Sequence, residues 1–189
     1  MPPSHSAISK RQAAIPRARW ARIRLFAMDV DGVLTDGTVQ IFSDGREAKA
    51  FSILDGHGLR KLARAGVVTA WISGRASGAT TVRAAELRIP HVIQDRIDKR
   101  AALENLAARL ALSPEQCAYM GDDDLDAPAI RWAGLGLAPP GAWPEAKRAA
   151  DYITARPAGQ GAVREICELL LAARPIAGSK RRQTGSQPP

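Results

Sequence analysis

The chain has 189 residues, of which 46% are hydrophobic, enough for one globular domain built around one core. Its apolar runs are too short to cross a bilayer, and residues 1–20 lack the apolar middle of a secretory signal, so no membrane partner is expected. The net charge of +8 comes from the two ends: residues 1–24 hold six bases, residues 174–189 hold four, and neither segment holds an acid. The remaining body is slightly acidic, which argues against a folded nucleic-acid surface, although basic ends can still attract polyanions.

The two ends are expected to lie outside the folded domain. Residues 1–21 form a basic N-terminal extension, which we favour over a weak likeness to a transit peptide. Residues 174–189 are rich in Gly, Ser and Pro and are expected to be a flexible tail, leaving residues 22–173 as a single domain. Cys117 and Cys167 lie in apolar segments without partners at zinc-binding spacing, so we expect reduced core residues.

Between these ends, strand-like and helix-like segments alternate. Residues 23–30 are a continuous apolar run, as in a strand buried on both faces. A hairpin is predicted next, with strands 38–42 and 47–52 around the turn signal Ser-Asp-Gly-Arg. The elements expected after it are a helix at 55–66, a strand at 67–73, a helix at 77–87, a strand at 91–94, a helix at 98–112 and a strand from 117. This alternation continues to residue 173 and predicts a mostly parallel sheet covered by helices.

Polar residues fall where these strands end. The four groups, in chain order, are Asp29-Val30-Asp31-Gly32, Ser73-Gly74-Arg75, Asp98-Lys99 and Gly121-Asp122-Asp123-Asp124. Because parallel strands present their carboxyl ends at one edge of a sheet, these groups should converge in one crevice. Carboxylates suit Mg²⁺, whereas glycine N–H groups and a lysine suit phosphate. A carboxylate beside a metal can also attack phosphorus and form an aspartyl-phosphate.

The first group requires a bend in the chain. Asp29 and Asp31 are one residue apart, and such residues point to opposite faces of an ideal strand. Both can reach one substrate if the chain curls after Asp29, and Gly32 permits this. Asp36 is expected to shape the following turn, and Asp126 to start a helix or pair with a lysine.

These motifs resemble the sequence motifs of a known enzyme superfamily. DxDGVLTDG with SGR, a lysine and GDDxxD resembles the haloacid dehalogenase superfamily of phosphotransferases. SDGREAKAFSILDGHGLRKL, WISGR, CAYMGDDDLDAP and GQGAVREICELLL resemble its 3-deoxy-D-manno-octulosonate 8-phosphate phosphatases, over about residues 22–173. The resemblance implies an α/β, Rossmann-like three-layer sandwich with a mostly parallel sheet and a β-hairpin inserted after the first strand. No cap domain is expected, because Asp36 to Ser73 leaves room for the hairpin and one helix.

The resemblance also implies a Mg²⁺ site. Asp29 would be the nucleophile and a metal ligand. Asp31 would protonate the leaving oxygen and then activate water, and its backbone carbonyl would bind the metal. Asp122 would be the third protein ligand, with Asp123 nearby as a ligand or supporting one.

The substrate contacts implied by the resemblance are a phosphate site and a carboxylate site. The residues expected to hold the transferring phosphoryl group are Gly32, Ser73, Gly74 and Lys99. Arg60 and Arg75 are candidates for the carboxylate of the sugar acid, because arginine can bind a carboxylate through two hydrogen bonds.

The prediction is therefore a cytoplasmic, Mg²⁺-dependent phosphatase that hydrolyses 3-deoxy-D-manno-octulosonate 8-phosphate in lipopolysaccharide biosynthesis. The family implies a homotetramer with residues 38–52 at the interface, and the C-terminal tail could reach a neighbouring site. A phosphatase of a nine-carbon ulosonate 9-phosphate and a non-catalytic regulatory domain stay open as alternatives. Departures from the usual family residues at His57, Asp95, Asp124 and Ala158 bear on sugar specificity.

Overall fold

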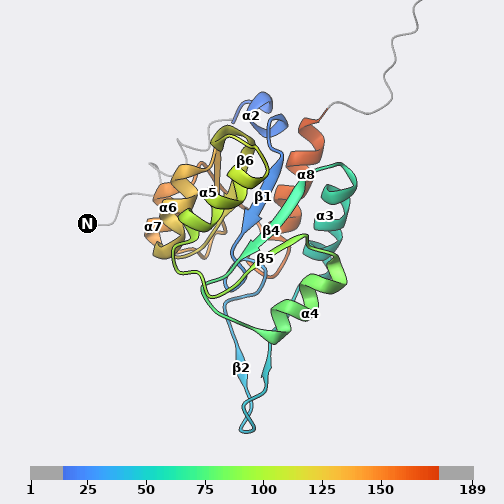
Figure 1. The fold of residues 1–189 in the computed structure, drawn as a ribbon, viewed down its shortest axis with the longest axis vertical. Coiled ribbons are helices and arrows are strands. Elements are labelled where there is room, and N and C mark those ends of the chain that lie inside the picture. The colour runs from blue at the N-terminus through green and yellow to red at the C-terminus, as the bar shows by residue number, and fades with distance from the viewer. Residues whose placement is uncertain (1–14, 175–189) are drawn as a thin grey trace, which may run out of the picture.

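The computed structural model describes residues 15–174 as a six-stranded parallel sheet with helices on both faces and a separate two-stranded hairpin (Figure 1). The strand order is β5-β4-β1-β6-β7-β8, and every neighbouring pair is parallel. The strands are β1 (Leu25–Met28), β4 (Val68–Ile72), β5 (His91–Ile93), β6 (Cys117–Met120), β7 (Leu135–Ala138) and β8 (Tyr152–Ile153). The predicted Rossmann-like α/β architecture is confirmed.

Helices cover both faces of the sheet and enclose a core on each. The helices are α2 (Arg17–Ala21), α3 (Ile53–Arg64), α4 (Gly78–Leu87), α5 (Lys99–Arg109), α6 (Ala127–Trp132), α7 (Pro144–Ala149) and α8 (Ala162–Ala173). One core joins the sheet to α2, α3, α4 and α8, and the other joins it to α5, α6 and α7. All four residues of β1 are buried, as expected for a central strand with a core on each face. None of the helices of residues 15–174 combines the length and apolar character needed to cross a bilayer.

Strand order explains where a site can form. The chain begins in the middle of the sheet at β1, runs outward through β4 to β5, and then crosses over to β6, β7 and β8. Ligands of such sheets bind where the direction of winding reverses, which here is the carboxyl edge between β1 and β6. The Asp29 N–H donates to the Met120 carbonyl at 2.9 Å, so the two loops that carry the acidic groups leave the sheet side by side.

Ordered structure begins before residue 22. The end of the expected basic extension forms α2, which packs beside α8 (Figure 1). Trp20 is buried, and its ring meets Tyr152 edge-on with 5.6 Å between ring centroids. Arg19 pairs with Asp151 at 2.6 Å. The expected flexible tail lies outside the described residues except for Arg174, whose side chain donates to backbone carbonyls.

The predicted hairpin is present with short strands. β2 (Gln40–Ile41) pairs antiparallel with β3 (Glu47–Ala48), and Gly45 has the positive φ of +83° that its turn requires. The hairpin extends away from the end of the sheet (Figure 1) and forms a sheet of its own. The ladder is shorter than the predicted strands 38–42 and 47–52, and Ser52, expected in the second strand, instead caps α3 through the Leu54 N–H at 3.2 Å. Between β1 and β4 the chain consists of this hairpin and α3.

The DGHG segment joins α3 to α8. Asp55 accepts hydrogen bonds from the backbone N–H groups of Gly161 and Arg164, at 3.3 and 2.7 Å, and so caps the start of α8. A Cβ at Gly58 would lie 2.8 Å from Arg164 Cδ, so glycine allows the two helices to approach closely. This segment, which helped to suggest the family, therefore stabilises the fold.

Candidate active site

The loop after β1 curls as predicted. Val30 is buried, and its carbonyl accepts from the N–H groups of Leu34 and Thr35 at 2.9 and 3.1 Å. Gly32 has φ of +84° within this curl, a conformation that favours glycine. The bend brings the side chains of Asp29 and Asp31 to the same edge of the sheet.

Gly32 is also needed for space. A Cβ at this position would lie 2.0 Å from Asp122 Oδ2, far inside contact distance. On the neighbouring loop, a Cβ at Gly121 would lie 2.2 Å from the Cβ of Asp126. Gly32 therefore allows the acidic loops after β1 and β6 to pack against each other, and Gly121 allows the loop after β6 to fold closely onto its own Asp126.

Lys99 supplies the positive charge beside these acids. It is the first residue of α5, whose N-terminus is capped by the Asp98 side chain, and it is buried. Its Nζ lies 2.6 Å from Asp29 Oδ2 and 2.8 Å from Asp126 Oδ1. Burial alone would lower the pKa of Lys99, but the two carboxylates raise it above its ordinary value, so the ammonium stays protonated.

Asp126 holds this arrangement together. Its Oδ1 accepts from Lys99 and from the Tyr119 hydroxyl, the latter at 2.8 Å. Its Oδ2 accepts from the backbone N–H groups of Asp122 and Asp123, both at 3.1 Å. Both oxygens are therefore engaged with the protein, which agrees with the lysine-pairing role expected for this residue.

The carboxylates of Asp29, Asp122 and Asp126 could together hold a metal ion. One oxygen of each lies within 4.8 Å of the others. Burial, with repulsion from the neighbouring carboxylates, raises the pKa of Asp29 to about 7 and that of Asp122 to about 8. Asp122 Oδ1 is buried and has no hydrogen-bond partner within residues 15–174. Each Asp126 oxygen already accepts two hydrogen bonds, whereas each Asp29 oxygen accepts one, so Asp29 and Asp122 are the carboxylates that fit a hard divalent cation.

The predicted phosphate-binding loop follows β4. Ser73 is buried, and its Oγ donates to the Arg75 carbonyl at 2.9 Å and accepts from the Arg75 N–H at 3.2 Å. Gly74 is exposed, and a Cβ there would approach no atom closer than the Arg96 carbonyl oxygen at 4.0 Å. The absence of a side chain at Gly74 is thus not required by packing and leaves its backbone open to a ligand.

A cavity of about 440 Å³ lies beside the acidic loops. The residues that line it are Asp31, Gly32, Asp36, Gly37, Asp122, Asp123, Pro139, Gly141, Trp143 and Ala158. Asp36 accepts from the Thr38 N–H at 2.8 Å, which is the turn-forming contact expected of it. Asp123 is half-buried, and its carboxylate accepts from the Asp124 N–H at 2.7 Å. Trp143 was not predicted as a site residue.

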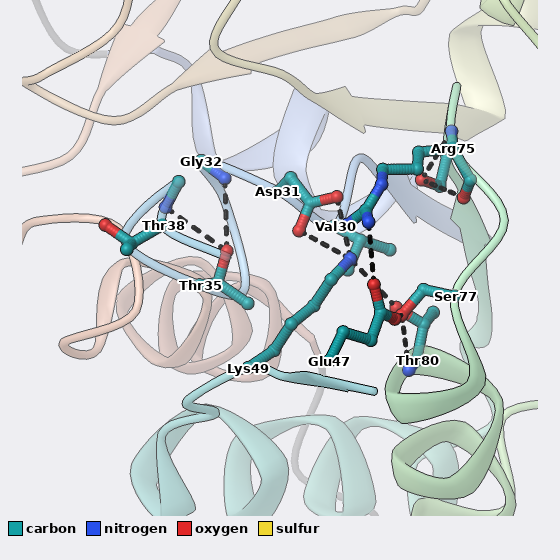
Figure 2. A network of polar contacts seen from close by, with 12 residues as sticks. Val30, Asp31, Gly32, Thr35, Thr38, Glu47, Lys49, Arg75, Ser77 and Thr80 are labelled. Atoms are coloured by element: carbon teal, nitrogen blue, oxygen red, sulfur yellow. Dashed lines mark hydrogen bonds and ion pairs between the residues drawn. The ribbon is translucent and has the colours of Figure 1, made fainter. Parts of the chain in front are cut away.

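Sequence reasoning also missed two charged residues of the hairpin (Figure 2). Lys49 Nζ lies 2.8 Å from both carboxylate oxygens of Asp31. Glu47 pairs with Arg75 at 2.8 Å and accepts a hydrogen bond from the Ser77 hydroxyl. Glu47 and Lys49 are two residues apart in the predicted strand 47–52, and this spacing, which would place both on one face of that strand, was the available signal.

The two arginines proposed for the sugar carboxylate lie apart from the cavity. Arg75 is engaged with Glu47, although 46% of its side chain is exposed. Arg60 is exposed on α3, and neither arginine is among the residues that line the cavity in the described part of the chain.

Fold and site together define a class of protein. A central parallel strand ending in two aspartates, a buried lysine and an acidic loop after the adjacent strand are the features of a haloacid dehalogenase-like hydrolase. The family model for haloacid dehalogenase-like hydrolases matches residues 75–166.

Individual relatives narrow this class. The chain is 42% identical over 156 residues to the 3-deoxy-D-manno-octulosonate 8-phosphate phosphatase KdsC of Escherichia coli K12, covering 82% of this chain and 83% of that protein. The Yersinia pestis phosphatase of the same name is 43% identical over 155 residues, with the same coverage of each chain. The chain therefore belongs to the 3-deoxy-D-manno-octulosonate 8-phosphate phosphatase family, whose members are phosphoric monoester hydrolases.

Solved structures agree with this assignment. The Moraxella catarrhalis 3-deoxy-D-manno-octulosonate 8-phosphate phosphatase, in complex with magnesium ion, phosphate ion and KDO, has a TM-score of 0.82 and 42% identity. The match covers 90% of this chain and 94% of that one. The cobalt-bound Haemophilus influenzae phosphatase has a TM-score of 0.80 and 34% identity, covering 82% of this chain and 91% of that one.

Proposed function

We propose that the protein is a Mg²⁺-dependent phosphatase that converts 3-deoxy-D-manno-octulosonate 8-phosphate into 3-deoxy-D-manno-octulosonate and phosphate. The observation that carries this proposal is the buried contact of Asp29 with Lys99, 2.6 Å long, near an Asp122 carboxylate oxygen that has no hydrogen-bond partner among residues 15–174. Relatives 42% identical carry this substrate in their name, and one of them has been solved with magnesium, phosphate and KDO. The matching reaction places the protein in lipopolysaccharide biosynthesis and, we propose, in the cytoplasm.

The proposed reaction has two displacements at phosphorus. In the first, an Asp29 oxygen bonds to phosphorus while the bond from phosphorus to the sugar oxygen breaks, and Asp31 gives its proton to that oxygen. In the second, Asp31 takes a proton from water as the water oxygen attacks the aspartyl-phosphate, which releases phosphate and regenerates Asp29. Asp29, Asp122 and the Asp31 carbonyl would hold Mg²⁺, which would offset the charge of the two carboxylates and polarise the phosphoryl group.

The remaining substrate contacts are assigned from where each residue lies in the site. Ser73, Gly74 and Lys99, with the backbone of Gly32, are proposed to hold the phosphoryl oxygens. Arg75 keeps its proposed role toward the sugar carboxylate, which would compete with Glu47 for its guanidinium. Arg60 stays the second candidate for that carboxylate, although it is exposed on α3 and does not line the cavity of its own chain.

We propose that subunits of this protein associate through the hairpin. Ile41 and Phe42 are 64% and 47% exposed, and Ile53 and Leu54 at the start of α3 are 82% and 51% exposed. Exposed large apolar side chains are typical of protein interfaces, and those of Ile41 and Phe42 on the hairpin support a homotetramer joined through residues 38–52. Light scattering at micromolar concentration tests this, and a monomer would contradict it. Truncation after Arg174 tests whether the tail reaches a neighbouring site, because turnover or KM should then change.

The function is tested by a phosphate-release screen across sugar-acid phosphates, with and without Mg²⁺. Release is expected from 3-deoxy-D-manno-octulosonate 8-phosphate, dependent on Mg²⁺ and abolished in Asp29→Asn, which removes the charge of the attacking oxygen. Preferential release from a nine-carbon ulosonate 9-phosphate would move the assignment to the alternative substrate. No release from any ulosonate phosphate would favour a non-catalytic regulatory domain.

A further inference from the structure

Lys49 is buried in an unusual way for a lysine. Its side chain is fully buried, although it belongs to a two-stranded hairpin that has few neighbours. It leaves the hairpin just after β3 and ends at the Asp31 carboxylate (Figure 2). Burying an ammonium is costly unless an opposite charge and hydrogen bonds compensate for the lost water. The ion pair with Asp31 provides this compensation, and Thr80 Oγ1 lies at 3.5 Å as a further acceptor.

The two oxygens of Asp31 are not equivalent in this contact. Lys49 Nζ is 2.8 Å from each, but the geometry of a hydrogen bond is met at Oδ2. Oδ1 is buried and has no hydrogen-bond partner in the range 15–174. The ammonium thus contacts both oxygens and orients the carboxylate through its hydrogen bond to Oδ2.

The base of the hairpin is fixed on a second side. Glu47, on the same face of the strand, pairs with Arg75 at 2.8 Å and accepts from the Ser77 hydroxyl. The Ser77 side chain also caps α4 through the Thr80 N–H, at 3.2 Å. Lys49 is therefore held between two anchored elements, the hairpin base and the start of α4, which is the rigidity that a positioning contact needs.

We infer that Lys49 positions the Asp31 carboxylate, so that the hairpin contributes to proton transfer at the active site. This inference rests on the proposed function. In the first displacement the proton moves from Asp31 to the sugar oxygen as the bond from phosphorus to that oxygen breaks. The Asp31 carboxylate that forms lies against the ammonium of Lys49. Lys49 stabilises this product of proton transfer and holds the carboxylate in one orientation.

Substrates with different leaving groups can distinguish a role of Lys49 in positioning Asp31 from a purely structural role. A sugar or alkyl phosphate releases a strongly basic alkoxide that must be protonated, whereas p-nitrophenyl phosphate releases a stable phenolate that needs no proton. The value of kcat/KM reports the steps up to the first displacement. A defect that acts through Asp31 should therefore be large for the sugar phosphate and small for the aryl phosphate.

The experiment compares Lys49→Met, Lys49→Arg and Lys61→Met with both substrates at saturating Mg²⁺. We expect Lys49→Met to lower kcat/KM for the sugar phosphate by about 10- to 100-fold and for the aryl phosphate by less than about threefold. Lys49→Arg should recover part of the loss. Lys61→Met is the matched control, since Lys61 pairs with Glu168 at 2.5 Å on the α3–α8 side, and it should leave both values unchanged. Lys49→Gln replaces Lys49→Met if the latter does not fold.

Equal losses for the two substrates, or no loss for either, in a folded Lys49 variant would overturn the inference. Asp31→Asn shows whether the fault then lies with the proposed function. If Asp31→Asn discriminates between the substrates and Lys49→Met does not, the role of Asp31 stands and that of Lys49 fails. If neither variant discriminates, or the wild type releases no phosphate, the proposed chemistry of Asp31 fails as well.

Discussion

Replacing Gly32 with alanine should damage the metal site more than the fold. The added Cβ would lie 2.0 Å from Asp122 Oδ2, and real Cβ contacts are essentially never shorter than 3.0 Å. The Asp122 carboxylate must therefore retreat by about 1 Å, a displacement that can lower the rate about 100-fold when it affects a positioned group. Alanine at φ of +84° adds strain of about 1–2 kcal/mol, which is a loss of stability rather than of activity.

Gly66→Ala separates these two effects. Gly66 has φ of +76°, and a Cβ there would have no atom within 4 Å, so this variant introduces similar backbone strain outside the site. Both variants should lose a similar free energy of unfolding in a denaturant titration. In phosphate-release assays over a range of Mg²⁺ concentrations, Gly32→Ala alone should show lower kcat and require more Mg²⁺. Equal Mg²⁺ dependence in the two variants would refute the proposed contact between Gly32 and Asp122.

Three further predictions concern buried carboxylates. Burial raises the pKa of Asp29 to about 7 and of Asp122 to about 8, so the metal-free folded state binds more protons than the unfolded state between about pH 4 and 8. Its stability should fall as pH rises through this range, and Mg²⁺ should raise the melting temperature more at pH 8 than at pH 5; equal shifts would contradict this. Asp126→Asn weakens the contact with Lys99, and we expect it to cost about 1–3 kcal/mol by denaturant titration and to lower kcat. Asp55→Ala removes the cap of α8 and should cost about 1–2 kcal/mol in the same titration, without changing the Mg²⁺ dependence of activity.

The sequence was informative where chemistry follows directly from chain order. The apolar run before Asp29 predicts a central strand, and parallel strands necessarily bring their carboxyl ends together. The contact of Lys99 with Asp29 could be expected because α5 begins at the same edge of the sheet. The curl at Gly32 followed from the spacing of Asp29 and Asp31, which an extended strand could not satisfy.

Contacts of the hairpin could not be predicted in the same way. Alternation places Glu47 and Lys49 on one face, but the partners of that face depend on how the hairpin lies against the body, and two-residue strands carry no signal for that. Helix α2 was missed for another reason. It has five residues and no side-chain hydrogen bond at its cap, so burial of Trp20 stabilises it rather than intrinsic helix propensity.

The close approach at Gly32 and Gly121 also bears on how mutational scans of this family are interpreted. Neither residue has a side chain that could react, yet any replacement would push a Cβ into a neighbouring aspartate, 2.0 Å from Asp122 Oδ2 or 2.2 Å from Asp126 Cβ. In a saturation screen for activity, both positions should be as intolerant as the nucleophile. A screen for abundance alone should separate them from it, because a variant of the nucleophile that keeps its fold would accumulate normally, whereas a replaced glycine also loses stability. Intolerance at these glycines would therefore measure the narrow space around the acidic loops rather than a chemical role.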